Sequence, residues 1–174
     1  MTLFAEKGFH AATVDEIARA AEVSPRTVTL YYPTKLDIAV ASLGRSVERL
    51  AELIKHNTPD KPVVDVLADW LTAEVANVDS EERRLRSAMY AANPFLIFSA
   101  PDESEQISEV VSGAFERELG RAAESDAIRF LMGAVAGGLL QFEITAGTAE
   151  QPAVAIALFK TLMEGLVEAA KTSS

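Results

Sequence analysis

Apolar residues recur along most of this chain three or four positions apart, a spacing that places side chains on one face of an α-helix. One such stripe consists of Leu36, Val40, Leu43, Val47, Leu50 and Ile54, and a second begins at Val63 and ends at Val78. No segment alternates apolar and polar residues for long enough to require a sheet. The pattern therefore predicts an all-α fold.

Residues that cap helix N-termini mark where the predicted helices begin. Thr13 and Glu16 have the spacing of a capping box. Ser24 followed by Pro25 is typical of an N-cap and a first helical residue, and Thr34 and Ser80 are further candidate N-caps. The expected helices span approximately 14–21, 25–32, 34–55, 63–78, 80–93, 107–119, 125–146 and 152–170, with a loop over 95–101.

The helix expected over 125–146 is apolar on nearly every face. Its longest uninterrupted apolar part, Phe130–Phe142, has 13 residues and includes Gln141. Because a membrane span needs about 20 apolar residues, we expect a buried core helix and no membrane association.

Three glycines lie inside this apolar helix, where each costs about 1 kcal/mol relative to alanine. Close approach of another helix would offset that cost, most simply a helix from a second subunit, although a tight internal contact is the alternative. The following helix carries Leu158, Leu162 and Leu166 on one side. We therefore expect a homodimer held by a four-helix bundle, with Gly133, Gly137, Leu158, Leu162 and Leu166 at the contact.

Charge is divided unevenly along the chain, whose net charge is −10. Residues 1–56 carry seven Lys or Arg and seven Asp or Glu, whereas residues 57–174 carry nine Lys or Arg and 19 Asp or Glu. Any attraction to nucleic acid must therefore come from a local patch in the N-terminal part. We expect two domains, a small helical unit over 1–46 and a larger helical domain over 47–174.

The segment TVDEIARAAEVSPRTVTLYYPTK has the features of a helix-turn-helix, in which a second short helix enters the DNA major groove. Ala18 and Val28 lie where two crossing helices must touch, and Val23 is expected to plug the turn between them. The other face of the second helix would show donors suited to phosphates and base edges, namely Arg26, Thr27, Thr29 and Tyr31. Of the tyrosine pair 31–32, we expect one ring to pack inward and one to face DNA.

These residues resemble the TetR-type bacterial regulators. The resemblance rests on LFAEKGF, TVDEIARAAEVS, the Tyr31-Tyr32 pair and Pro33-Thr34-Lys35, and it covers about residues 3–43. It implies a homodimeric, cytoplasmic regulator of transcription, most simply a repressor, that binds double-stranded DNA at a palindromic operator and is released by a small-molecule effector. It also implies a DNA-binding surface made of Thr13, Ser24, Pro25, Arg26, Thr27, Thr29, Tyr31, Tyr32 and Lys35.

Two features depart from the family pattern. Glu22 occupies a turn position that is usually glycine, and a left-handed backbone there costs about 1–2 kcal/mol. Only Met1 and Thr2 precede LFAEKGF, where the family has a basic arm. Either the start is trimmed or this member lacks the arm. Together with the acidic charge, the second departure suggests the alternative to a regulator, a helical ligand-binding or interaction module that does not bind DNA.

Bulky residues spread over the larger domain predict an apolar ligand pocket, although each of them alone could simply fill the core. The expected ligand-binding residues are Trp70, Met89, Tyr90, Phe95, Phe98, Phe115 and Phe130. Arg83, Arg84 and Arg86 could meet an anionic ligand, but a solvated helix face paired with Glu81 and Glu82 is the preferred interpretation.

Enzyme chemistry is not indicated by the sequence. There is no cysteine, and the two histidines do not lie at metal-ligand spacing from carboxylates. No phosphate-binding glycine loop, GxSxG or HExxH motif occurs. We therefore expect no catalytic residue, no metal and no cofactor.

Overall fold

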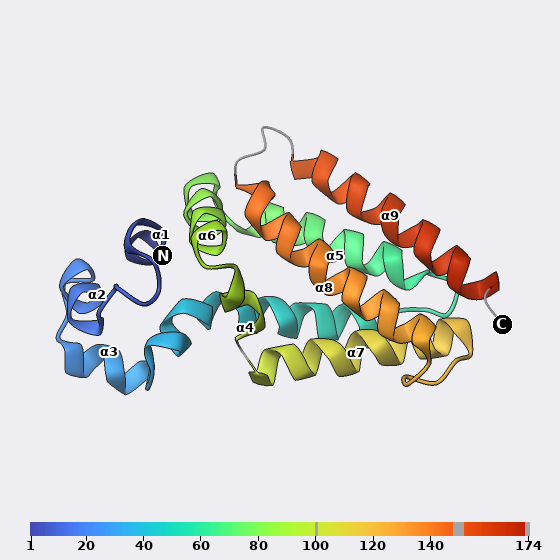
Figure 1. The fold of residues 1–174 in the computed structure, drawn as a ribbon, viewed down its shortest axis with the longest axis horizontal. Coiled ribbons are helices and arrows are strands. Elements are labelled where there is room, and N and C mark those ends of the chain that lie inside the picture. Colours follow the sequence, from blue (N-terminus) through green and yellow to red (C-terminus); the bar gives the residue numbers. More distant parts are fainter. Residues whose placement is uncertain (100, 148–151, 173–174) are drawn as a thin grey trace.

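The computed structural model describes residues 1–99, 101–147 and 152–172, and all regular secondary structure in these ranges is helical (Figure 1). The expected all-α fold is therefore confirmed. The elements are α1 (Thr2–Lys7), α2 (Val14–Ala20), α3 (Pro25–Tyr31), α4 (Lys35–Lys55), α5 (Val63–Asn77), α6 (Ser80–Ala92), the 3-10 helix η1 (Pro94–Phe98), α7 (Pro101–Leu119), α8 (Asp126–Ala146) and α9 (Pro152–Thr172).

Most helix boundaries lie within two residues of those expected from the capping residues. Ser24 accepts from the N–H of Thr27 at 3.0 Å, and Thr34 accepts from the N–H of Asp37 at 3.2 Å. Two expectations were wrong. Asp79, not Ser80, caps α6, because its carboxylate accepts from two backbone N–H groups at 2.8 and 2.9 Å. The segment expected to be a loop contains η1, and α7 already begins at Pro101.

Helices α1, α2 and α3 form a small unit at one end of the molecule, and α4 runs from this unit into the larger body (Figure 1). In the body, α9 packs against α5 and α8, α8 also packs against α6 and α7, and α4 packs against α5 and α7. The main core is filled by residues of these helices, among them Leu67, Phe115, Leu131 and Met163. Because α4 passes continuously through residue 46, the expected boundary between the domains lies within a helix.

A second, smaller core joins the N-terminal unit to the body. Phe4 from α1 and Met89 and Tyr90 from α6 are almost completely buried in it, together with Leu96 from η1. The N-terminal unit is therefore held by α6 as well as by α4.

Helix α8 is long and apolar enough to cross a membrane, the only such helix among the described residues by length and composition. A core helix meets the same criteria. Here α8 packs against α6, α7 and α9, and its residues Leu131, Val135 and Leu139 are buried in the main core. Only 28% of its most apolar stretch is buried within one chain, so much of its apolar surface remains open.

Candidate nucleic-acid interface and ligand cavity

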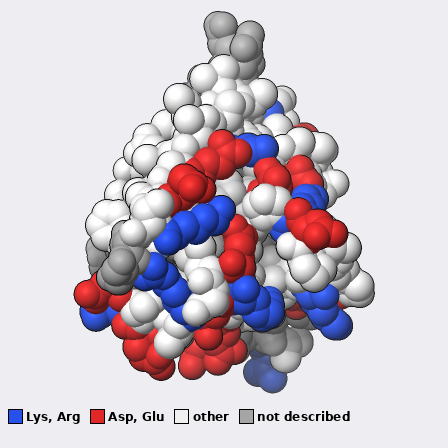
Figure 2. Space-filling view, turned by 90° about the vertical axis from the view of Figure 1, so that its right-hand side faces the viewer, with Lys and Arg blue, Asp and Glu red and all other residues white. Residues whose placement is uncertain are grey.

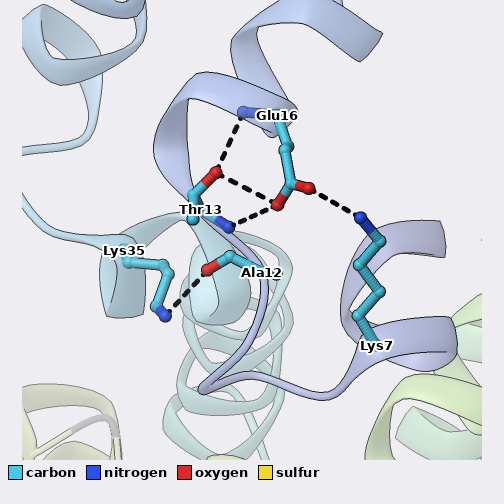
Figure 3. Close-up of polar contacts among 5 residues, drawn as sticks. All are labelled: Lys7, Ala12, Thr13, Glu16 and Lys35. Carbon is cyan, nitrogen blue, oxygen red and sulfur yellow. Dashed lines mark hydrogen bonds and ion pairs between the residues drawn. The ribbon is translucent and has the colours of Figure 1, made fainter.

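The first helix of the helix-turn-helix is held at its N-terminus by a charged capping box (Figure 3). The Thr13 hydroxyl accepts from the N–H of Glu16 at 3.2 Å, and the Glu16 carboxylate accepts from the N–H of Thr13 at 3.0 Å. Lys7 reaches the same carboxylate from α1 at 2.6 Å. The bond from Lys7 and those from Thr13 lower the pKa of Glu16 to about 2. Thr13 therefore fixes the start of α2.

The turn between α2 and α3 adopts the strained conformation expected at Glu22, whose φ is 56°. Ala18 is completely buried and Val28 is 8% exposed, so small and branched residues lie where the two helices cross. The expectation that Val23 plugs the turn was wrong, because this side chain is 43% exposed. The crossing is held by Ala18 and Val28 instead.

The outer surface of α3 is unusually open. Of its seven residues only Val28 is buried. Tyr31 is 73% and Tyr32 is 37% exposed, so the expectation that one tyrosine packs inward was wrong. Arg26, Thr27 and Thr29 are also exposed. The expected DNA-binding residues between 24 and 32 are therefore all exposed.

One exposed residue of this surface was missed by the sequence interpretation. Leu30 is 76% exposed on α3, beside Tyr31 and Thr29. The sequence interpretation gave Leu30 no role. Its exposure was the missing signal, and an apolar side chain there is suited to contact a thymine methyl group in a major groove.

The cations of the N-terminal unit differ in what they contact. Lys7 pairs with Glu16, and the ammonium of Lys35 donates to the carbonyl of Ala12 at 2.9 Å (Figure 3). The same ammonium donates to the carbonyl of His10 at 3.2 Å. Among the described residues, Arg19 and Arg26 form no ion pair. These two arginines are therefore the cations left to meet phosphates or base edges, and Arg19 was not among the expected residues.

At the opposite end of the molecule, acidic and basic side chains are intermixed on the surface (Figure 2). Several of them are paired, such as Lys160 with Asp65 at 2.6 Å and Lys61 with Asp69. This face therefore lacks the single-sign field that attracts a nucleic acid backbone.

Asn93, at the C-terminal end of α6, joins the body to the N-terminal unit. Its side-chain amide donates to the carbonyls of Phe4 and Met89, both at 2.9 Å. Its oxygen accepts from the N–H of Phe9 at 2.7 Å. The side chain is 4% exposed. A movement of α6 would therefore be transmitted directly to the backbone of α1 and the loop after it.

A cavity of about 190 Å³ lies in the body and is lined mostly by apolar side chains. Six helical elements, α4, α5, α6, η1, α7 and α8, contribute to its wall. The lining residues are Leu43, Ser46, Trp70, Leu71, Arg86, Tyr90, Ile97, Phe98, Ile107, Ser108, Met132, Val135, Ala136, Leu139, Phe142 and Glu143.

Only some of the expected ligand-binding residues line this cavity. Trp70, Tyr90 and Phe98 do so, whereas Met89 and Phe115 are completely buried in the two cores. The ring of Phe95 lies outside, stacked 5.6 Å from the ring of His10. Phe130 is 68% exposed on α8. Sequence spacing identified bulky residues but did not separate core positions from cavity positions.

The charged part of the cavity wall is an ion pair between α6 and α8. Arg86 Nε lies 2.9 Å from an oxygen of Glu143, and the two side chains are 7% and 20% exposed. Burial raises the pKa of Glu143, although Arg86 acts in the opposite direction. The preferred interpretation of Arg86 as part of a solvated face was therefore wrong.

Comparison with known proteins gives the same result for the N-terminal unit. Residues 1–41 match the family model described as bacterial regulatory proteins of the tetR family. The N-terminal unit therefore matches the TetR family. The HTH-type transcriptional repressor KstR of Rhodococcus jostii is 24% identical over 119 residues, which cover 68% of this chain and 55% of that repressor. KstR of Mycobacterium tuberculosis is 21% identical over 126 residues, which cover 72% of this chain and 57% of that repressor.

The chain thus spans little more than half the length of these curated relatives. The part of this chain that matches the family model contains α1, α2, α3 and the start of α4. It is the unit that carries the open surface of α3. This N-terminal match and the two repressors named above support the expected helix-turn-helix regulator.

Proposed function

We propose that this TetR-family protein is a homodimeric repressor that binds a palindromic operator through α3 and is released by a small, mostly apolar ligand. The observation that carries the proposal is the open surface of α3, where six of seven residues are exposed. A helix held by only one buried residue is free to enter a major groove. The cited relatives are transcriptional repressors by name.

Dimerisation is proposed through α8 and α9. In a single chain Phe130 is 68%, Leu158 is 67% and Leu162 is 56% exposed, and Val154 on the same face is 52% exposed. A cluster of exposed, bulky apolar side chains on two adjacent helices is typical of a subunit interface. A second copy related by a two-fold axis would cover it and would form a four-helix bundle.

The glycines of α8 separate into two groups that allow a direct test. A side chain added at Gly133 or Gly137 meets no atom within 4 Å in one chain, whereas one added at Gly138 lies 2.7 Å from the ring of Phe159. We expect Gly137→Leu to leave the chain folded and to split the dimer. Sedimentation would show this as a monomer at micromolar concentration with unchanged helical circular dichroism. A wild-type protein that is already monomeric would contradict the proposed interface.

Release of DNA is proposed to start at the cavity. Helix α6 carries both cavity residues, Arg86 and Tyr90, and the junction residue Asn93. Helix α4 carries Leu43 and Ser46 at the cavity and begins beside α3. A ligand that shifts α6 or α4 would change the distance between the two recognition helices. In the DNA-binding form that distance should be about 34 Å or a multiple of it. The ligand then acts by differential binding to two conformations.

The DNA-binding role is tested with the native DNA upstream of the gene in an electrophoretic shift assay. Arg26→Ala should weaken binding by about 1–3 kcal/mol and relax the preference at one position of each half-site. Arg84→Ala, an equal change of charge on an exposed position of α6, serves as the control. Absence of any shift with the wild-type protein would favour the alternative, a helical module that does not bind DNA.

A further inference from the structure

We propose that the ligand of the cavity is an uncharged molecule with an apolar body and one hydrogen-bond acceptor, such as a ketone oxygen, which binds the Nε–H of Arg86. This inference deepens the proposed function by assigning a chemical class to the effector. It rests on the existence of the cavity but is tested without DNA.

The shape of the cavity wall calls for an elongated apolar body. The lining residues of α8 lie at 132, 135, 136, 139, 142 and 143, which is one face of a helix. From Met132 to Glu143 this face extends for about 16 Å. On this face of α8 only Glu143 is polar, so a ligand group that meets the charged pair of Arg86 and Glu143 would lie at the Glu143 end.

The charges at that end are already balanced. Glu143 neutralises Arg86, and the neighbouring buried carboxylate of Glu74 receives two bonds from Arg49, both at 2.7 Å. An anionic ligand would meet a carboxylate without a free cation, and a cationic ligand would meet a guanidinium without a free anion. Burial of either unpaired charge is unfavourable, which leaves an uncharged polar group.

One hydrogen-bond donor in this wall has no acceptor. Arg86 Nε lies 2.9 Å from a carboxylate oxygen of Glu143 but does not meet the geometry of a hydrogen bond to it. It is the only buried side-chain nitrogen or oxygen without a hydrogen-bond partner among the described residues. Arg86 as a whole is 6% exposed. A buried donor without an acceptor is rare in folded proteins, and a ligand oxygen would satisfy it.

The chain carries its own reporter for a binding experiment. Trp70 is its single tryptophan and lines the cavity, so quenching of intrinsic fluorescence follows binding in the DNA-free protein. The probes are 2-decanone, decanoate and decylamine, which share a carbon chain and differ in charge. We expect 2-decanone to bind about tenfold or more tightly than either charged probe at neutral pH.

Two substitutions then separate the roles of the ion pair. Glu143→Gln leaves an unpaired cation at Arg86, so decanoate should gain about tenfold or more in affinity and overtake 2-decanone. Arg86→Met combined with Glu143→Leu removes the donor without leaving a lone charge, and 2-decanone should lose about tenfold. Arg84→Met, on the exposed side of α6, is the matched control.

The proposal is overturned if wild-type protein prefers decanoate or decylamine, if the double variant keeps its affinity for 2-decanone, or if no probe changes the fluorescence of Trp70. None of these results depends on operator binding. A protein that binds 2-decanone as expected but fails to shift its upstream DNA would contradict the proposed repressor function and leave the ligand class supported.

Discussion

Replacing Asn93 by alanine should destabilise the N-terminal unit and leave the main core of the body folded. The substitution removes three hydrogen bonds, to Phe4, Met89 and Phe9. Two of the groups keep another partner, since the Phe4 carbonyl still accepts from Gly8 at 3.1 Å and the Met89 carbonyl from the N–H of residue 93 at 3.0 Å. The N–H of Phe9 loses its acceptor.

The magnitude follows from these three bonds. Each contributes about 0.5–1.5 kcal/mol net, so their loss together should lower the free energy of unfolding by about 2–4 kcal/mol. The loss is local, because all the affected groups lie in α1, the loop after it and the end of α6. Amide hydrogen exchange in α1, α2 and α3 should therefore rise more than in α9.

Urea unfolding of Asn93→Ala and Asn77→Ala, followed by helical circular dichroism, measures the difference. Asn77 is exposed at the end of α5, and its replacement should change stability by less than about 0.5 kcal/mol. The reasoning fails if the two variants are equally stable, or if exchange rises as much in α9 as in α1. Either result would mean that Asn93 does not hold the N-terminal unit on α6.

Three further substitutions test other parts of the structure. Gly138→Leu places a side chain against the ring of Phe159 and should lower stability by about 1–3 kcal/mol, measured by thermal unfolding. Lys35→Met removes the hydrogen bonds to the carbonyls of His10 and Ala12, so it should lower the melting temperature. The salt dependence of operator binding should stay unchanged, whereas loss of a phosphate contact would make it shallower. Glu16→Gln tests the effect of pH. Because the pKa of Glu16 is lowered, its carboxylate stabilises the fold above pH 4.5, and this stabilisation is lost as the pH falls toward about 2. The difference in stability between wild type and variant should therefore disappear between these two pH values.

Local signals in the sequence determined where the helices begin and how the helix-turn-helix is built. The capping residues Thr13, Ser24 and Thr34 contact groups three positions away, so their effect does not depend on the rest of the fold. The left-handed backbone at Glu22 is likewise a property of a short turn between two capped helices. For the same reason the helix pair could be located from its capping residues, and the resemblance to the TetR-type regulators then identified it as a DNA-binding unit.

The tertiary structure decided which side of each helix is buried. Three arginines within four positions of α6 have three different surroundings: Arg83 donates to the carbonyls of Val75 and Val78, Arg84 is exposed, and Arg86 lies in the cavity wall against Glu143. Residues 86 and 143 are far apart in the sequence, and no spacing rule within one helix relates them. Packing between helices that are distant in the sequence also decides which bulky residues lie in the core and which line the cavity. The junction made by Asn93 depends on the same packing, because the burial of a side chain is set by the neighbouring helix and not by the helix that carries it.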